Sequence, residues 1–276
     1  MVTLSERLKA IANMVSPGLI CADVGCDHAY LAIYLAENDI APFVYATDIN
    51  RGPIEAAKRN IEQAGLSDRI ETILCSGLKG IKPGSVQSVI MAGMGGPLMV
   101  EMIREGIKVC DLAKELILEP QSDPALVRHY LDDMGFLIIS EDMVTEENKF
   151  YPVIKCVHYN RGQKASGDRS ARGGSKEREL SEGFRPEDVW EKEHKELYYR
   201  FGEILLKEEH PLLREYLYRQ RKILKGIRDK LSVSEETESV LLKRAEIERD
   251  LFYVEEALAV INRSNPVEKE RVLKEN

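Results

Sequence analysis

Residues 19–31 read LICADVGCDHAYL, a short apolar strand followed by an acidic turn with one glycine and the start of a helix. This order is typical of the first unit of a doubly wound sheet, where backbone N–H groups face a small ligand at the carboxyl end of the strand. A second apolar strand, residues 43–47, is followed directly by Asp48. An acid at that position typically binds the two hydroxyl groups of a ribose. The two turns therefore predict a site for a cofactor that contains a nucleoside.

The pattern after these turns predicts an α/β fold with seven strands. Helices separate the first five strands, and the last two strands follow each other with only an acidic loop between them. Such a terminal hairpin is unusual for a NAD-binding sheet. A helix over 97–109 follows the glycine-rich turn at 93–96. The strands are expected at residues 19–24, 42–48, 70–75, 86–91, 115–118, 136–144 and 151–159.

Beyond residue 160 the composition changes twice. Residues 161–184 are rich in Gly, Ser, Arg and Lys and have little to bury, which predicts a flexible basic linker. Apolar residues then recur at heptad spacing over 213–231 and again over 247–261, which predicts an antiparallel coiled-coil hairpin. Two ordinary helices packed on the first domain are the alternative. We expect a cofactor-binding domain at 1–160, the linker at 161–184 and a helical coiled-coil domain at 185–276.

Length and composition restrict the class of protein. The 276 residues carry a net charge of −8, which argues mildly against a nucleic-acid partner unless basic side chains cluster locally. No apolar run is long enough for a membrane span, and the N-terminus does not read as a secretory signal. Five cysteines without a C-x-x-C pair indicate reduced thiols in a cytoplasmic protein and give no zinc site. We expect no metal and a monomer.

The first turn discriminates between cofactors. A dinucleotide turn needs G-x-G-x-x-G so that the backbone can approach a pyrophosphate, but Gly25 stands alone here and Asp27 follows it. A ligand with a ribose and a cationic amino-acid part, but without phosphates, fits better, and S-adenosylmethionine is such a molecule. Asp23 or Asp27 would meet its ammonium group. In the alternative interpretation these two acids only cap the helix that begins near Ala29.

Two further turns are expected at the same edge of the sheet. Ser76 and Gly77 follow the third strand, where a small polar group suits the amino edge of an adenine ring. Residues 92–97 read AGMGGP after the fourth strand, and three glycines in four residues allow the backbone to approach a ligand closely. Close packing of strand against helix is an equally good explanation for Gly96, but a poorer one for Gly93.

DVGCDHAYL at 23–31 together with IMAGMGG at 90–96 resembles the TrmK family of bacterial tRNA (adenine-N1)-methyltransferases, which act on adenosine 22. The resemblance covers nearly the whole chain and implies a class I methyltransferase domain, with a Rossmann-like sheet, followed by a coiled coil. It also implies S-adenosyl-L-methionine as the cofactor and tRNA as the partner. The cofactor-binding residues are then expected to be Asp23, Gly25, Cys26, Asp27, His28, Asp48, Ile49, Asn50, Ser76, Gly77, Ala92, Gly93 and Met94.

The chain departs from the family pattern at two turns. Where the family usually has G-D-G-L after the third strand, this chain has Cys75-Ser76-Gly77-Leu78, so the acid that would hold the adenine amino group is replaced by Ser76. Where the family often has Q-P-N after the fifth strand, this chain has Glu119-Pro120-Gln121. The contact to the adenine amino group is therefore expected to be weaker or mediated by water.

Methyl transfer to N1 of adenine depends on positioning, because neutral adenine already carries a lone pair at N1. The product is cationic until its exocyclic amine loses a proton, so nearby carboxylates or backbone carbonyls would stabilise the developing charge. Since N1 lies on the pairing edge, the base is expected to leave its stack. Tyr30, Phe150 or Tyr151 would then stack on it. The expected catalytic residues are Asp27, His28, Gly93, Met94 and Gly95, although His28 could equally be a structural residue at a helix start.

Two basic stretches are candidates for contact with RNA phosphates. Residues 161–178 hold six basic and two acidic side chains, and residues 214–230 hold seven basic and two acidic ones. A solvated helix face is the alternative for the second stretch. The RNA-binding residues are expected to be Tyr30, Tyr151, Arg214, Arg221, Lys222, Lys225 and Arg228.

Two rival functions share most of these features. A methyltransferase for another substrate would keep the cofactor turns and differ after the fourth strand, where amino methyltransferases of nucleic acids often carry N/D-P-P-Y/F instead of glycines. A non-catalytic RNA-binding protein on the same fold need not bind the cofactor. Cofactor binding and mapping of the methylated nucleoside separate the three interpretations.

Overall fold

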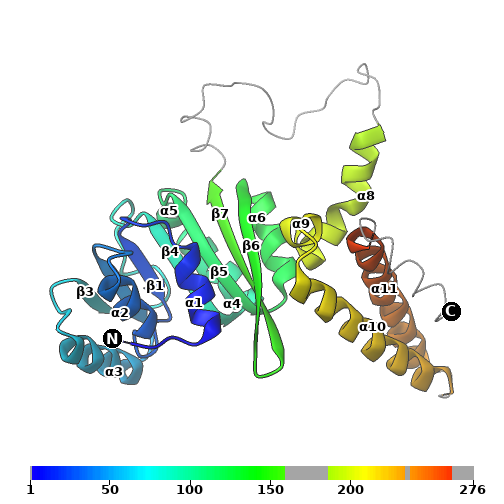
Figure 1. Cartoon of the computed structure of the whole chain (residues 1–276), viewed down its shortest axis with the longest axis horizontal. Helices are drawn as coiled ribbons and strands as arrows, with labels where there is room; N and C mark the ends of the chain where they lie inside the picture. Colours follow the sequence, from blue (N-terminus) through cyan, green and yellow to red (C-terminus); the bar gives the residue numbers. More distant parts are fainter. Residues whose placement is uncertain (1, 159–185, 234–236, 263–276) are drawn as a thin grey trace. The chain divides into compact units, whose positions relative to one another are not determined.

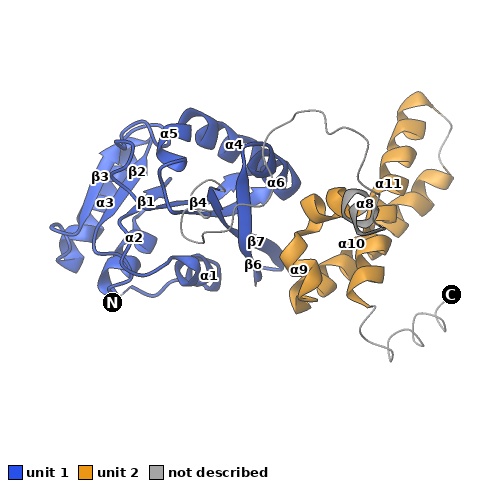
Figure 2. Cartoon of the chain, turned by 90° about the horizontal axis from the view of Figure 1, so that it is seen from above, with its two compact units in different colours: residues 1–185 blue, residues 186–276 orange. Residues whose placement is uncertain are grey.

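The structure is a computed structural model that describes residues 2–158, 186–233 and 237–262. The chain divides into two compact units, residues 1–185 and 186–276 (Figure 2). The predicted linker at 161–184 lies outside the described residues. The predicted domain boundaries and the flexibility of that linker therefore stay predictions.

Unit 1 contains a seven-stranded sheet with the strand order β3-β2-β1-β4-β5-β7-β6. The first five strands pair in parallel, and β7 runs antiparallel to both β5 and β6. The seven-stranded α/β fold with a terminal hairpin is therefore confirmed. The strands are β1 (Cys21–Val24), β2 (Val44–Asp48), β3 (Ile70–Leu74), β4 (Ser88–Gly95), β5 (Glu115–Ser122), β6 (Phe136–Glu146) and β7 (Lys149–His158).

Helices cover both faces of the sheet (Figure 1). One hydrophobic cluster joins the sheet to α1 (Glu6–Met14), α2 (Tyr30–Glu37) and α3 (Arg51–Ala64). A second cluster joins the other face to α4 (Gly96–Glu105), α5 (Ile107–Cys110) and α6 (Pro124–Asp133). Every residue of β1 is buried, as expected for a central parallel strand with helices on both sides. This burial leaves the strand ends as the positions where polar side chains can reach a ligand.

The glycine-rich segment after the fourth strand differs from the prediction. The sequence predicts a turn at 93–96, but β4 continues to Gly95 because β5 also extends beyond its predicted end and pairs with it as far as Ser122. The pairing is irregular, with register shifts on both sides of Met94. The helix predicted over 97–109 is broken at Gly106, where a Cβ atom would lie 2.6 Å from Leu78.

Unit 2 is helical, with α8 (Pro186–Phe201), α9 (Glu203–Lys207), α10 (Pro211–Ser232) and α11 (Glu238–Ile261). Helices α10 and α11 run antiparallel, because contacts join Tyr218 to Asn262 at one end and Leu231 to Arg244 at the other. Most of their heptad residues are buried, while Ile227 and Leu231 on α10 are partly exposed. The buried ones are Leu213, Leu217 and Leu224 on α10, and Ile247, Leu251, Val254, Leu258 and Ile261 on α11. The paired helices are thus present, while coiled-coil packing in the strict sense stays a prediction.

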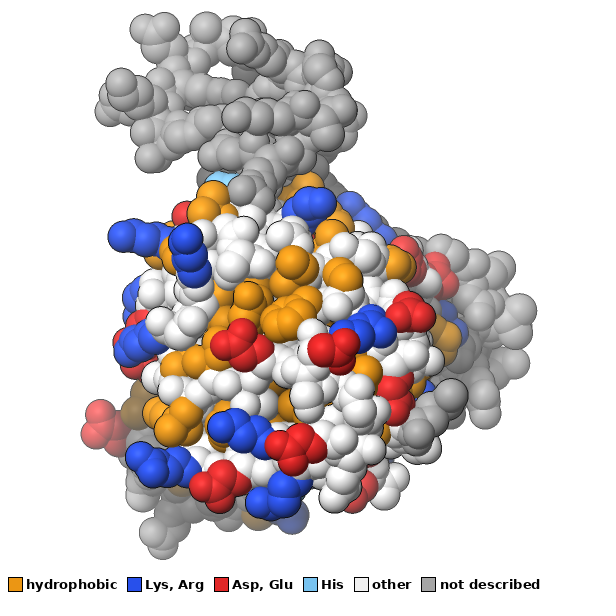
Figure 3. Space-filling model, turned by 90° about the vertical axis from the view of Figure 1, so that its left-hand side faces the viewer, with side chains coloured by type: hydrophobic (Ala, Val, Ile, Leu, Met, Phe, Trp, Pro, Cys, Tyr) orange, Lys and Arg blue, Asp and Glu red, His pale blue; other side chains and the backbone are white. Residues whose placement is uncertain are grey.

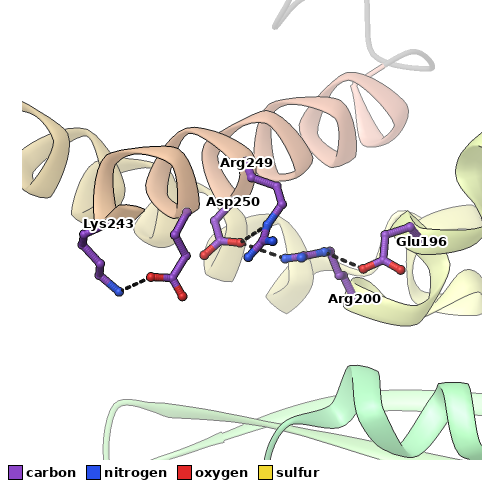
Figure 4. A network of polar contacts seen from close by, with 6 residues as sticks. Glu196, Arg200, Lys243, Arg249 and Asp250 are labelled. Atoms are coloured by element: carbon purple, nitrogen blue, oxygen red, sulfur yellow. Dashed lines mark hydrogen bonds and ion pairs between the residues drawn. The ribbon is translucent and has the colours of Figure 1, made fainter. Parts of the chain in front are cut away.

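A polar network ties α8 to α11 in unit 2 (Figure 4). The guanidinium of Arg200 donates to Glu196 at 3.0 Å and to Asp250 at 3.0 Å. It also lies 4.3 Å from the centre of the Tyr253 ring. Arg249 approaches the same Asp250 carboxylate at 3.9 Å. Because these charges pair with one another, this part of unit 2 serves its own folding.

The described residues contain neither a membrane-spanning helix nor a cluster of metal ligands. None of their helices combines the length and the apolar character that crossing a bilayer requires. No group of three or more His, Cys, Asp or Glu side chains among them is arranged to hold a metal ion. The expectation of a metal-free protein stays a prediction.

Candidate active site

The turn after β1 has the strained backbone of a ligand-binding loop. Gly25 has φ 77°, and the non-glycine residues Asp27 and Ala29 also have positive φ values of 48° and 58°. The backbone N–H groups of Gly25 and Cys26 both donate to the carbonyl oxygen of Thr47, at 2.8 and 2.9 Å. The turn is therefore held against the end of β2.

A pocket of about 340 Å³ opens at this turn. It lies between the end of β1, the end of β4 and the first turn of α1, so it brings together the two motifs that the sequence singled out. Residues from both motifs line it, together with three from outside them, Arg7, Leu8 and Gln121. The lining residues are Arg7, Leu8, Asp23, Gly25, Cys26, Asp27, His28, Tyr30, Leu31, Ala92, Gly93 and Gln121.

Asp23 is the buried acid of this pocket. The residue is 4% exposed, and its Oδ2 atom has no hydrogen-bond partner among the described residues. The pKa of Asp23 is raised to about 7, chiefly by burial and to a lesser degree by the nearby Asp48 carboxylate, against the opposing effect of the backbone N–H of Ala32. An isolated buried acceptor is costly unless something pairs with it. A cationic ligand group would supply that partner.

Asp27 and His28 lie on the exposed side of the turn. The Asp27 carboxylate contacts Nε2 of His28 at 3.6 Å, and among the described residues it makes no hydrogen bond to the start of α2. The described contacts thus give no support to the capping alternative for Asp27, whereas Asp23 does lie near a backbone N–H of α2. Asn60 on α3 donates to the backbone carbonyl of His28 at 2.9 Å and holds the turn from outside.

His28 and Tyr30 form a stacked pair of rings. Their centroids are 5.5 Å apart, the ring planes are 28° from parallel, and Tyr30 is 46% exposed. Both residues line the pocket. The pair is a flat aromatic surface at the pocket, on which a planar base can stack.

The remaining predicted cofactor residues lie at the neighbouring strand ends and do not line this pocket. The Asp48 carboxylate accepts a hydrogen bond from the backbone N–H of Asn50 at 2.8 Å, and Ile49 is exposed. The Gly77 carbonyl accepts from the Thr47 hydroxyl at 3.1 Å, so the turn that carries Ser76 is joined to β2. The side chain of Met94 approaches Gly25, since a Cβ atom there would lie 3.5 Å from its terminal methyl group. Gly95 is the last residue of β4.

An ion-pair cluster that the sequence did not predict borders the pocket. Arg7 donates to Glu119 at 2.8 Å and to Glu146 at 3.3 Å, and its guanidinium lies 5.5 Å from the centre of the Tyr151 ring. The same Glu119 oxygen accepts the backbone N–H of Gly93 at 2.7 Å. Arg7 stands in an ordinary amphipathic helix, and only the fold brings it beside β4 and β5. Tyr151 contacts the guanidinium of Arg7, and its predicted stacking on a base stays a prediction.

The basic residues predicted for RNA contact lie on α10 in unit 2. Arg221 and Lys225 both contact Glu255 on α11, at 3.6 and 3.2 Å, and Arg214 and Arg228 also contact acidic neighbours. Lys222 is exposed. Figure 3 shows a face of unit 1, not α10: Lys and Arg side chains there are interspersed with Asp and Glu around hydrophobic ones, so the described residues of that face form no continuous basic patch. The basic stretch 161–178 lies outside the described residues.

The pocket suits S-adenosylmethionine rather than a phosphate-containing cofactor. Its lining holds two carboxyl groups, and Asp23 offers a buried oxygen without a partner among the described residues. Arg7, the one Lys or Arg among the described residues that line it, is already paired with two carboxylates. Such a lining attracts a cationic group and repels phosphates.

Comparison with known proteins agrees with this assignment. A family model described as a methyltransferase domain matches residues 4–154. The curated tRNA (adenine(22)-N(1))-methyltransferase of Bacillus subtilis (strain 168) is 34% identical over 151 residues, which cover 55% of this chain and 63% of that protein. The match thus spans less than two thirds of the length of that relative.

Solved structures extend the likeness to both units. The B. subtilis m1A22 tRNA methyltransferase TrmK has 27% identity and a TM-score of 0.75, covering 94% of this chain and 100% of that one. Streptococcus pneumoniae Sp1610 in complex with S-adenosyl-L-methionine has 26% identity and a TM-score of 0.71, covering 93% of this chain and 100% of that one. These matches confirm the resemblance to TrmK carried by the motifs at 23–31 and 90–96, and the chain belongs to the methyltransferase-domain family.

Proposed function

We propose that this chain transfers a methyl group from S-adenosyl-L-methionine to N1 of adenosine 22 in tRNA. The observation that carries the proposal is the pocket in which the turn at 23–28 meets Ala92 and Gly93 beside the buried, unpaired oxygen of Asp23. The likeness to TrmK supports the choice of nucleoside. A cytoplasmic location and a monomer go with this proposal, and size-exclusion chromatography with light scattering tests the monomer.

The cofactor site proposed here uses four strand ends. When bound, S-adenosylmethionine supplies an electrophilic methyl group on a positively charged sulfur. Asp23 and Asp27 hold the ammonium group, with the backbone of Gly25, Cys26 and His28 beside it. The ribose and adenine are held by the second and third turns, from Asp48, Ile49, Asn50, Ser76 and Gly77. Ala92 and Met94 close the site from β4, and Gly93 lies between them, where the cofactor and the acceptor base meet.

The chain's own residues then position the acceptor base. His28 and Tyr30 provide a stacked aromatic surface at the pocket, where an extruded adenine can lie. No general base is needed before attack, because N1 carries a lone pair. Positive charge develops on the base as the bond forms, and the Asp27 carboxylate with the backbone carbonyls of residues 93–95 stabilises it.

Helix α10 is proposed as the RNA-contacting element of unit 2. The pairing of Arg221 and Lys225 with Glu255 reduces their share of the attraction for RNA phosphates, so the exposed Lys222 carries more of it. Residues Arg214 and Arg228 are part of the same proposal. Charge on this helix then fixes the orientation of the tRNA without reading its sequence.

The decisive experiment is methylation of unmodified bacterial tRNA with labelled cofactor, followed by mapping of the modified nucleoside. Label in 1-methyladenosine at position 22 is the expected result, and a transcript with guanosine at position 22 is the control. Label at another nucleoside, or in protein, would identify a methyltransferase with a different substrate. Binding of tRNA without any binding of the cofactor would identify the non-catalytic alternative.

A further inference from the structure

The acid Glu119 lies behind the wall of the pocket. Its side chain is fully buried, and one oxygen, Oε2, accepts both the backbone N–H of Gly93 at 2.7 Å and the guanidinium of Arg7 at 2.8 Å. A single atom therefore joins β5, β4 and α1. Gly93 and Arg7 line the pocket, whereas Glu119 does not. Any effect of Glu119 on a ligand must act through these two residues.

The contact with Gly93 replaces a missing sheet hydrogen bond. In the ladder between β4 and β5, Ala92 pairs with Glu119 and Met94 with Pro120, so Gly93 has no partner residue of its own. Pro120 also has no N–H group to offer to β4. Gly93 has φ 76°, a left-handed conformation that turns its backbone away from the regular strand. The Glu119 carboxylate is what holds the Gly93 N–H in this irregular segment.

Arg7 is held from both sides. Its Nε donates to Glu146 on β6 at 3.3 Å, and its guanidinium lies 5.5 Å from the centre of the Tyr151 ring on β7. Two carboxylates face one guanidinium, so the cluster as a whole is negative. It is therefore suited to positioning a base that becomes positively charged rather than to binding a phosphate.

The position of the cluster assigns it to the acceptor side of the pocket. The proposed nucleoside contacts of the cofactor come from β2 and β3, and the strand order places β5 on the opposite side of β1 and β4. The part of the pocket lined by Arg7, Gly93 and Gln121 lies toward β5 and α1. It is the part left for the second substrate.

Glu119 also has an unusual environment for a purely structural acid. Its second oxygen, Oε1, is buried without a hydrogen-bond partner among the described residues. Burial raises the pKa of Glu119 against the opposing effects of Arg7 and the Gly93 N–H, and Glu146 adds to the increase. Arg7 from α1 and Glu146 from β6 are the charged groups that face it, and Tyr151 from β7 lies behind Arg7.

We propose that Glu119 is a positioning residue for methyl transfer, which fixes the Gly93 backbone and the Arg7 guanidinium at the acceptor side of the pocket. The inference rests on the proposed function. It assigns a role to the acid that stands where the resembling family often has glutamine. Replacing it should impair turnover while leaving cofactor binding in place.

The test compares the wild type with E119M, E119Q, R7M and the double variant R7M/E119M. The control is E62Q, the same chemical change as E119Q at an exposed position of α3. The readouts are kcat and KM with unmodified tRNA, the Kd for S-adenosylmethionine, the melting temperature and the Gly93 amide resonance. The amide resonance reports the contact without any turnover.

We expect E119M to lower kcat about 100-fold and E119Q about tenfold, because the amide keeps one acceptor for Gly93 but loses the ion pair. The Kd for the cofactor should stay within about threefold. R7M should resemble E119M, and the double variant should be no worse than either, since the two residues act as a unit. The Gly93 amide proton should move upfield in E119M and shift with pH in the wild type but not in E119Q.

Three results would overturn the inference: wild-type kcat in both E119M and R7M, an unmoved Gly93 resonance in E119M, or a kcat loss explained by weaker cofactor binding. If the wild type methylates tRNA and the variants match it, only this inference fails. If the wild type binds the cofactor but methylates no tRNA, the proposed function fails, and this inference fails with it.

Discussion

Two buried carboxyl groups, one at the amino ends and one at the carboxyl ends of the parallel strands, differ in whether their oxygens have hydrogen-bond partners. Glu115 at the start of β5 and Asp23 near the end of β1 are each 4% exposed. Glu115 accepts from the Ser16 backbone and hydroxyl and from the Ser88 hydroxyl, and it lies 2.9 Å from Lys155. Asp23 retains an oxygen without a partner among the described residues. Equal burial thus goes with a paired carboxylate at the amino ends of the strands, and at their carboxyl ends with an oxygen that we propose binds the cofactor.

Removing Lys155, the charged partner of Glu115, has the largest expected effect on this comparison. The change Lys155→Met should destabilise unit 1 by about 3 kcal/mol, because it leaves the Glu115 charge buried with only neutral donors. Cofactor affinity of the folded protein should be unchanged. Denaturant unfolding and calorimetric titration measure the two quantities. Adding Glu115→Gln should recover part of the stability, and a variant as stable as the wild type would remove the distinction between the two ends.

Asp23→Asn tests the other end. We expect cofactor affinity to fall about 100-fold, since the ammonium group loses a charged partner in a buried setting. The melting temperature at pH 8 should not fall and is expected to rise, because the variant no longer buries a negative charge there. Titration calorimetry and thermal unfolding check this. A variant that binds like the wild type would show that Asp23 does not contact the cofactor.

The pKa of Asp23 predicts how binding depends on pH. Since it lies at about 7, the group is partly protonated in the free protein near neutrality, and a cation requires its ionised form. Affinity should therefore rise about fivefold from pH 6 to pH 7, and binding at pH 7 should release about half a proton. Calorimetry in buffers of different ionisation enthalpy measures that release. Proton uptake, or no exchange, would contradict the assignment.

The same raised pKa has a consequence for stability without ligand. The protonated Asp23 favours the folded state, so its contribution is fully present below the unfolded value of 3.8 and is lost as the pH rises through about 7. The melting temperature of Asp23→Asn relative to the wild type should therefore increase between pH 5 and pH 8.

The smallest expected effect concerns α10. Lys222→Glu should weaken tRNA binding more than Arg221→Glu, because Arg221 is already compensated by Glu255. We expect a difference of about threefold at low salt that disappears as salt is added. Filter binding across a salt series measures it. Equal losses in both variants would mean that pairing with Glu255 does not reduce the attraction of α10 for RNA.

Much of the site could be predicted because its motifs are local. The strand and turn at 19–31 specify an acid at a strand end, and the absence of the further glycines of a dinucleotide turn argues against a pyrophosphate from the residue pattern alone. The structure then places the turn at 23–28 and residues 92 and 93 around one pocket. Leu8 could not be predicted, since nothing in its local pattern distinguishes it from an ordinary helix residue. Leu31 and Gln121 lie within stretches that the sequence analysis quotes, but no local signal assigns their side chains to the pocket.

The sequence by itself determined the alternation of strands and helices, the acidic first turn and the heptad spacing of α10 and α11, because these depend on periodicity and on near neighbours along the chain. Only the tertiary structure decided that Arg7 meets Glu119 across 112 residues and that β4 runs on through its glycines. It also decided which basic side chains of α10 are neutralised by α11. Such contacts depend on the register and packing of distant segments, which local residue patterns do not encode.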